Sequence, residues 1–219
     1  SLEESLRAVS EAGSASLGTA FVIHEMYGQR VPMVLTDSDG QQMNMQPSGK
    51  DNWAVRAREG YARKLKSSPQ ILASLVGLPM SAISDEVMVI DAGRSGVVLP
   101  VNTPDDVTNA HLDARMLHSY AMLLNTEPQV YVWAHSAPDA IVSRMFYGPS
   151  GGVVEVAATG SGAANLGNWF AAHGRHGTWR IRQGAAVGRP SVLDLEVRPD
   201  NTVYVGGHVN HVATGTISF

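Results

Sequence analysis

The amino-acid sequence predicts an α+β protein built from two similar halves, each a curved, mostly antiparallel sheet around a single central helix. The first observation is a duplicated pattern, because Leu, Gly, Phe and His recur at identical spacings in residues 17–24 and 166–173. The second is that a Gly-Ser turn precedes each copy and a strand-like hairpin follows it. The third is that strands dominate the rest of the chain. Two copies of one supersecondary unit indicate a duplication.

In the first half, β-type residues bounded by turn residues predict strands, and apolar residues at helical spacing predict helices. The expected strands are residues 6–9 and a hairpin over residues 31–45. The expected helices span residues 17–26, 51–66 and 70–76. In residues 51–66 charged residues separate the apolar ones, so the basic side chains should lie on the solvated side of one helix. This segment could be a lid, a dimer contact or an insertion.

The second half begins with short β-branched segments and is expected to end in strands. A helical region should run over residues 103–124, and a second helix should follow the turn at Thr159, Gly160 and Ser161. The expected strands are residues 87–91, 96–101, 129–134, 140–146, 179–183, 192–198, 202–206 and 208–218. The predicted domains are therefore an N-terminal half, residues 1–85, and a C-terminal half, residues 86–219.

Composition excludes several classes of protein. The net charge of −4 and the isoelectric point near 6.0 argue against nucleic-acid binding, which favours a basic face. The chain has no cysteine, so disulfides, thiolate nucleophiles, cysteine-based zinc sites and a two-cysteine racemase mechanism are excluded. A long apolar run and a leader-like start are both lacking in the sequence, so no membrane association and a cytoplasmic location are expected.

A candidate anion-binding turn lies at Thr159, Gly160 and Ser161. Glycine lets the backbone approach a ligand, and a Ser or Thr hydroxyl can cap the helix that follows. The first backbone N–H groups of a helix are unpaired and carry the positive end of its dipole, so they attract a carboxylate or phosphate. Gly13 and Ser14 precede the first copy of the repeat in the same way. The alternative is that Gly-Ser before an apolar helix is an ordinary cap.

Glu155 is the ionisable residue beside this turn, and a partly desolvated carboxyl group there could exchange protons with a substrate. The alternatives are that it is solvated or paired with Arg144. Ser161 does not lie in a Gly-x-Ser-x-Gly elbow, so hydrogen-bond donation suits it better than nucleophilic attack. His173 and His176 come where a helix should end, so they are expected to complement its dipole, and no metal site is expected.

Three stretches, residues 144–146, 152–161 and 184–191, together with residues 205–207, closely resemble the phenazine-biosynthesis PhzF-like family. Residues 12–20 are similar to its front motif. The resemblance implies the diaminopimelate epimerase fold, an active site between two halves, catalysis without a cofactor, and a homodimer. Family members usually carry a longer N-terminus with an Asn-Leu-Ser-Glu-Thr segment that supplies an acid/base Glu. Here Ser14 replaces the family's His, and Val156 replaces its Asp.

Together these observations predict an isomerase that shifts a proton on a small cyclic or unsaturated carboxylic acid. Glu155 and Ser14 are the candidate catalytic residues, and the substrate carboxylate would bind at the two turns formed by Gly13, Ser14, Thr159, Gly160 and Ser161. One alternative is a catalytically silent relative that binds a carboxylate or serves as a structural partner. Another is that the chain is incomplete at its front, where a missing strand would supply the acid/base.

Overall fold

The computed structural model describes residues 13–36, 40–49, 52–148 and 152–216. The chain divides into two compact units, which we describe separately. Unit 1 comprises residues 1–55 and 206–219, and unit 2 comprises residues 56–205. These units are defined by packing alone, so the division into two homologous halves at residue 85 stays a prediction.

Unit 1 consists of one helix and a small antiparallel sheet. Its elements are α2 (Gly13–Tyr27), β1 (Met33–Thr36), β2 (Gln42–Ser48), most of β3 (Asn52–Arg56) and the end of β12 (Val203–His208). β2 pairs with β1 and with β3 in antiparallel register. The predicted first helix and hairpin are confirmed, and the expected strand at residues 6–9 lies outside the described residues. A core centred on Ala20, Met45 and Trp53 joins helix and sheet.

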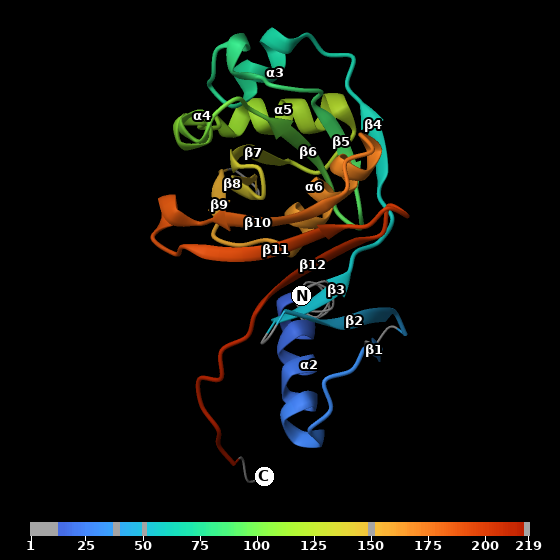
Figure 1. Cartoon of the computed structure of the whole chain (residues 1–219). Coiled ribbons are helices and arrows are strands. Elements are labelled where there is room, and N and C mark those ends of the chain that lie inside the picture. The colour runs from blue at the N-terminus through green and yellow to red at the C-terminus, as the bar shows by residue number, and fades with distance from the viewer. Residues whose placement is uncertain (1–12, 37–39, 50–51, 149–151, 217–219) are drawn as a thin grey trace. The chain divides into compact units, whose positions relative to one another are not determined.

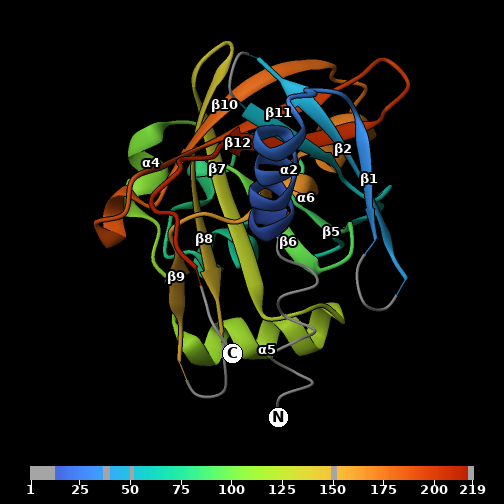
Figure 2. The same cartoon turned by 90° about the horizontal axis from the view of Figure 1, so that it is seen from below.

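Unit 2 has a larger sheet with the strand order β12-β11-β10-β8-β7-β6-β5-β4, and β9 pairs with β8 (Figures 1 and 2). Most neighbours are antiparallel, whereas β6–β7 and β8–β10 are parallel. The strands not yet bounded are β4 (Tyr61–Lys64), β5 (Met88–Asp91), β6 (Ser95–Pro100), β7 (Gln129–Ala137), β8 (Ala140–Tyr147), β9 (Val154–Val156), β10 (Gly177–Gln183) and β11 (Ser191–Val197). The α+β class with curved, mostly antiparallel sheets around single helices is confirmed.

The helices of unit 2 cover the two faces of this sheet. α6 (Gly160–Ala172) packs against one face, and α3 (Pro69–Leu75), α4 (Pro104–Asn109) and α5 (Ala114–Leu124) form a second core on the other. Two 3₁₀ turns, η1 (Met80–Ala82) and η2 (Ala185–Val187), complete the elements of this unit. The helical region predicted over residues 103–124 is divided in two, because Thr103 and Asp113 each cap a helix of their own.

The helix predicted over residues 51–66 is wrong, because strands β3 and β4 occupy this segment. The apolar residues fit a helical period, but the segment forms two strands that pair with others: β3 pairs with β2, and β4 pairs with β5. Gly60 lies between the two strands, and its N–H donates to Asn168 Oδ1 at 2.7 Å. A Cβ at Gly60 would lie 2.7 Å from Asn168 Cγ, so this close approach needs glycine. Tertiary pairing thus overrides local periodicity.

The strand predicted over residues 208–218 is also wrong within the described residues. β12 ends at His208, and residues 209–216 have no regular structure. The alternating Val and Thr residues suit a strand, but a strand also needs a neighbour that satisfies its backbone groups. No neighbouring strand accompanies residues 209–216 in the part of the chain that the structure describes.

Gly167→Ala should destabilise unit 2, whereas Gly18→Ala, its counterpart in the repeat, should not destabilise unit 1. A Cβ at Gly167 would lie 2.4 Å from Val203 Cγ1, whereas a Cβ at Gly18 meets nothing within 4 Å. We expect a loss of about 1–3 kcal/mol from overpacking at Gly167 and a gain of up to about 1 kcal/mol from helix propensity at Gly18. Thermal unfolding of both variants followed by circular dichroism measures this. Equal melting temperatures would contradict the packing of α6 described here.

Candidate functional site

The first turn of α6 offers backbone donors to a ligand. Thr159 is the N-cap, and its hydroxyl accepts the Gly162 N–H at 3.3 Å, while its carbonyl accepts the Ala163 N–H at 3.2 Å. The N–H groups of Gly160 and Ser161, at the first two helical positions, have no intrahelical acceptor. They lie at the positive end of the dipole of a 13-residue helix. The predicted turn into a helix is confirmed, and its chemistry suits an anion.

Ser161 contributes a hydroxyl to the same turn. Its Oγ lies 2.9 Å from Thr159 Oγ1, so the two side chains share a hydrogen bond beside the free backbone donors. Gly160 is exposed and Ser161 is half-buried, which leaves this turn accessible. Gly13 and Ser14 begin α2 in unit 1, and their side chains lie outside the described residues. Their participation in a site therefore stays a prediction.

Glu155 lies on the side of the sheet opposite to α6. β9 pairs with β8 so that Glu155 is opposite Phe146, which belongs to the core under α4 and α5. Successive side chains of a strand alternate between faces, and the next residue, Val156, packs against the α6 core. The structure therefore brings Thr159, Gly160 and Ser161 together but directs the Glu155 carboxylate away from α6.

The Glu155 carboxylate forms an ion pair with Arg144, which was one of the two alternatives predicted for it from the sequence. Arg144 Nη2 donates to Glu155 Oε2 at 2.7 Å, and the two side chains are only 17% and 9% exposed. The other oxygen, Glu155 Oε1, is buried and has no hydrogen-bond partner among the described residues. The Arg144 guanidinium also lies 4.7 Å from the centre of the Phe146 ring. This is a largely desolvated ion pair.

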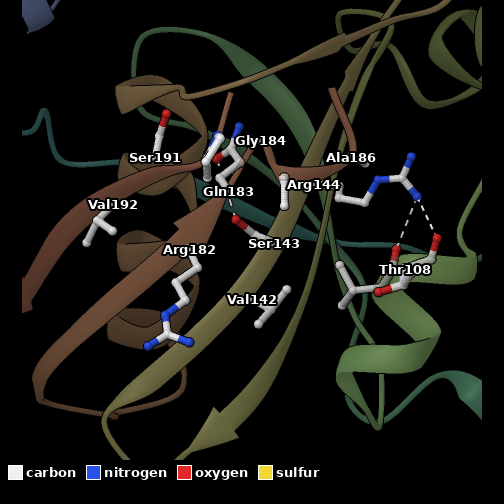
Figure 3. A pocket seen from close by; sticks show the side chains of 13 residues that line it. Thr108, Val142, Ser143, Arg144, Arg182, Gln183, Gly184, Ala186, Ser191 and Val192 are labelled. Atoms are coloured by element: carbon white, nitrogen blue, oxygen red, sulfur yellow. Dashed lines mark hydrogen bonds between the residues drawn. The ribbon is translucent and has the colours of Figure 1, made fainter. Parts of the chain in front are cut away.

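Arg144 also closes the end of α4. Its Nη1 donates to the carbonyl oxygens of Val107 and Thr108 at 3.3 and 2.9 Å (Figure 3), and also to that of Ala110 at 2.6 Å. The last carbonyl groups of a helix lack intrahelical donors and carry partial negative charge, so a guanidinium stabilises them. One arginine on β8 thus fastens α4 through its carbonyls and β9 through Glu155. β9 leads directly into the turn at Thr159.

A buried chain of polar groups, which was not predicted from the sequence, lies next to the turn at Thr159. The Tyr131 hydroxyl donates to Ser143 Oγ at 2.9 Å, Ser143 donates to Gln183 Oε1 at 3.5 Å, and Gln183 Nε2 donates to the Val156 carbonyl at 2.7 Å. Burial raises the pKa of Tyr131, so its phenol stays a neutral donor. The Tyr131 ring also packs on Gly162, where a Cβ would lie 2.6 Å away. Polar residues at core positions of strands were the available signal.

The described residues contain no group of three or more His, Asp or Glu side chains placed to hold a metal ion. None of their helices combines the length and apolar character needed to cross a bilayer.

The fold is that of the PhzF and epimerase group of proteins. A PhzF-family phenazine biosynthesis protein from Bacillus anthracis is similar with a TM-score of 0.71 and 14% identity, over 90% of this chain and 72% of that one. A predicted epimerase from Pseudomonas aeruginosa is similar with a TM-score of 0.69 and 21% identity, over 90% and 71% of the two chains. At such identities the likeness establishes the fold.

The sequence comparisons identify the family. The phenazine biosynthesis-like protein family, PhzC-PhzF, matches residues 12–215, so the chain belongs to it. An uncharacterised isomerase from Pasteurella multocida is 27% identical over 207 residues, which are 94% of this chain and 69% of that protein. The resemblance inferred from residues 144–191 is confirmed.

Glu155→Gln should destabilise unit 2, because it leaves the largely buried Arg144 guanidinium without a counter-charge. We expect a loss of about 2–4 kcal/mol in the free energy of unfolding. The matched control is Glu127→Gln, which neutralises the partner of Arg94 in a pair whose side chains are 39% and 38% exposed. That variant should lose less than about 1 kcal/mol. Urea denaturation of both variants provides the comparison, and equal losses would contradict a structural role for the Arg144–Glu155 pair.

Proposed function

We propose that this protein is a cofactor-independent isomerase that shifts a proton on a small cyclic or unsaturated carboxylic acid. Membership of the PhzC-PhzF family and similarity to a bacterial protein named as an isomerase support this proposal. The structural likeness to a predicted epimerase agrees with it. The observation on which it rests is the open first turn of α6, where two backbone donors and a hydroxyl converge.

A carboxylate at this turn would accept hydrogen bonds from the N–H groups of Gly160 and Ser161. Hydrogen bonds to a charged acceptor contribute about 1.5–3 kcal/mol each, and the helix dipole adds to them. The same donors would stabilise negative charge that develops on the carboxylate as a neighbouring carbon loses its proton. Binding and activation of the substrate would therefore use the same groups.

The acid/base in this proposal is Glu155, with Ser14 as a hydrogen-bonding partner of the substrate. The buried Oε1 atom of Glu155 has no partner among the described residues and could receive a proton. Against this, its Oε2 atom is held by Arg144, and the carboxylate lies on the side of the sheet away from α6. Catalysis by Glu155 would require the ion pair to open.

The second candidate is a silent family member that binds a carboxylate without moving a proton. The Arg144–Glu155 pair favours it, because a carboxylate engaged in a largely buried ion pair with Arg144 is a poor proton shuttle. Val156 favours it too, since an apolar side chain packs against the α6 core at this position, where the resemblance expects an Asp. Both candidates use the same anion-binding turn.

Proton exchange with solvent distinguishes the two candidates. The protein would be incubated in D₂O with a panel of small unsaturated and amino carboxylic acids, and C–H signals followed by NMR. Deuterium at a carbon next to a carboxylate is expected for the isomerase. Saturable binding without exchange at any pH would overturn the isomerase in favour of the silent binder.

Gly160→Pro should weaken carboxylate binding, whereas Gly160→Ala should not. Proline at the first helical position removes one N–H without breaking the helix, and a Cβ there meets nothing within 4 Å. The preceding residue, Thr159, already has the extended backbone that a following proline requires (φ −143°, ψ 115°). We expect roughly a tenfold rise in Kd for Gly160→Pro and less than about a twofold change for Gly160→Ala. NMR titration measures both, and equal affinities would place the carboxylate elsewhere.

A further inference from the structure

We propose that unit 2 carries a second binding site, for a small apolar carboxylate, on the face of the sheet opposite to α6. A pocket of about 620 Å³ lies there between the end of α4, the outer side of β8, β10 and β11, and the loop over residues 184–190 (Figure 3). Its volume falls within the range of small-molecule sites in proteins.

The floor of the pocket follows from strand register. Val142, Arg182 and Val192 are direct neighbours across β8, β10 and β11. In the adjacent row, Ile141 and Ile181 are fully buried in the α6 core. Side chains alternate along a strand, so the row containing Arg182 projects from the other face. Figure 3 shows the Arg182 side chain between those of Val142 and Val192.

One wall of the pocket is a loop with a fixed shape. Gly184 and Gly188 have φ values of +83° and +70°, and a Cβ at Gly184 would lie 2.3 Å from the Ala157 carbonyl oxygen. The loop is closed by the Arg189 N–H donating to the Gly184 carbonyl at 3.0 Å and the Gly188 N–H donating to the Ala185 carbonyl at 3.1 Å. A wall that is ordered before binding lowers the entropic cost of holding a ligand.

The charge of the lining selects an anion. Two of the lining residues are arginines and none is acidic. The charge of Arg144 is compensated by Glu155. No hydrogen bond or ion pair joins the Arg182 guanidinium to another residue within the described ranges. Arg182 therefore remains available to a carboxylate, for which a guanidinium provides paired donors.

The rest of the pocket lining is mostly apolar, so it favours an acid whose remaining part is apolar. Valine, alanine and proline side chains form most of the surface around Arg182, and Val192 is 53% exposed. Covering such a surface with an apolar group is favourable by about 25 cal/mol per Å². A flat, apolar monocarboxylate combines both features. The site is distinct from the α6 turn, because none of Thr159, Gly160 and Ser161 lines the pocket.

Titration of the whole chain with 1-naphthoate tests the site, with 1-naphthalenemethanol as the neutral control. We expect saturable NMR shifts at residues 182–192 with 1-naphthoate and at least about tenfold weaker binding of the alcohol. Arg182→Gln should weaken naphthoate binding to the same extent. Arg180→Gln, two residues away on the same face and outside the lining, should change it less than about twofold.

Two further variants make the outcome decisive. Val192→Trp should abolish the shifts by filling the pocket. Gly160→Pro should leave them unchanged. The proposed α6 site and the proposed pocket site can therefore fail independently of each other. Circular dichroism verifies that each variant is folded. Lack of saturable binding, equal binding of acid and alcohol, or equal effects of Arg182→Gln and Arg180→Gln would overturn the proposal.

Discussion

The structure of unit 2 depends on the enclosure of a mostly apolar helix whose middle has no exposed face. Residues 162–170 of α6 are all buried, and side chains from β5 to β8 and β10 to β12 surround them. Such a helix is unstable in water, so the sheet must curve around it. Gly162 and Gly167 let the strands approach, as the Cβ contacts at these positions show. Two buried amides complete the enclosure. Asn165 and Asn168 satisfy backbone groups of the chain around Ala92 and Gly60, which closes the sheet over the helix with hydrogen bonds as well as apolar contacts.

This enclosure determines where chemistry can occur. The middle of α6 is inaccessible, so the exposed start of the helix at Gly160 is where its backbone can meet a ligand. The segment that leads into this start is held from both sides of the sheet. Gln183 holds the Val156 carbonyl on one side, and Arg144 holds the Glu155 carboxylate on the other. The turn is consequently positioned by Gln183 and Arg144, which lie outside it. An approach held in this way would suit the pre-organised anion binding that we propose better than it would suit a mobile acid/base.

The sequence predicted the parts of this arrangement that are local. The two helices that carry the Leu-Gly-x-x-Phe spacing, the capped turn at Thr159 and most strands depend on neighbours in the chain, and the structure confirms them. Pairing is not local, and there the prediction failed. The apolar residues of segment 51–66 fit a helical period, yet the segment forms strands because it pairs with β2 and β5. The orientation of Glu155 depends on the register of β9 against β8, which no spacing within residues 152–161 encodes. The pocket at Arg182 joins residues from 107 to 192 and could not be found from any one stretch.

The two arginines that line the pocket have different roles. Arg144 is largely buried and paired, whereas Arg182 is exposed and available to a ligand. Arg144 is largely desolvated, so it requires compensation, and it obtains this from Glu155 and from the carbonyls of α4. Removing that compensation would leave a buried charge, which fixes Arg144 in a structural role. Arg182 is exposed, so water can hydrate its guanidinium and the fold tolerates it without a partner among the described residues. An acid that replaces this water gains only a modest free energy from charge alone, because exposed ion pairs are weak. Affinity at the pocket must therefore come from the valine and alanine walls, and Arg182 then discriminates an acid from a neutral molecule of the same shape.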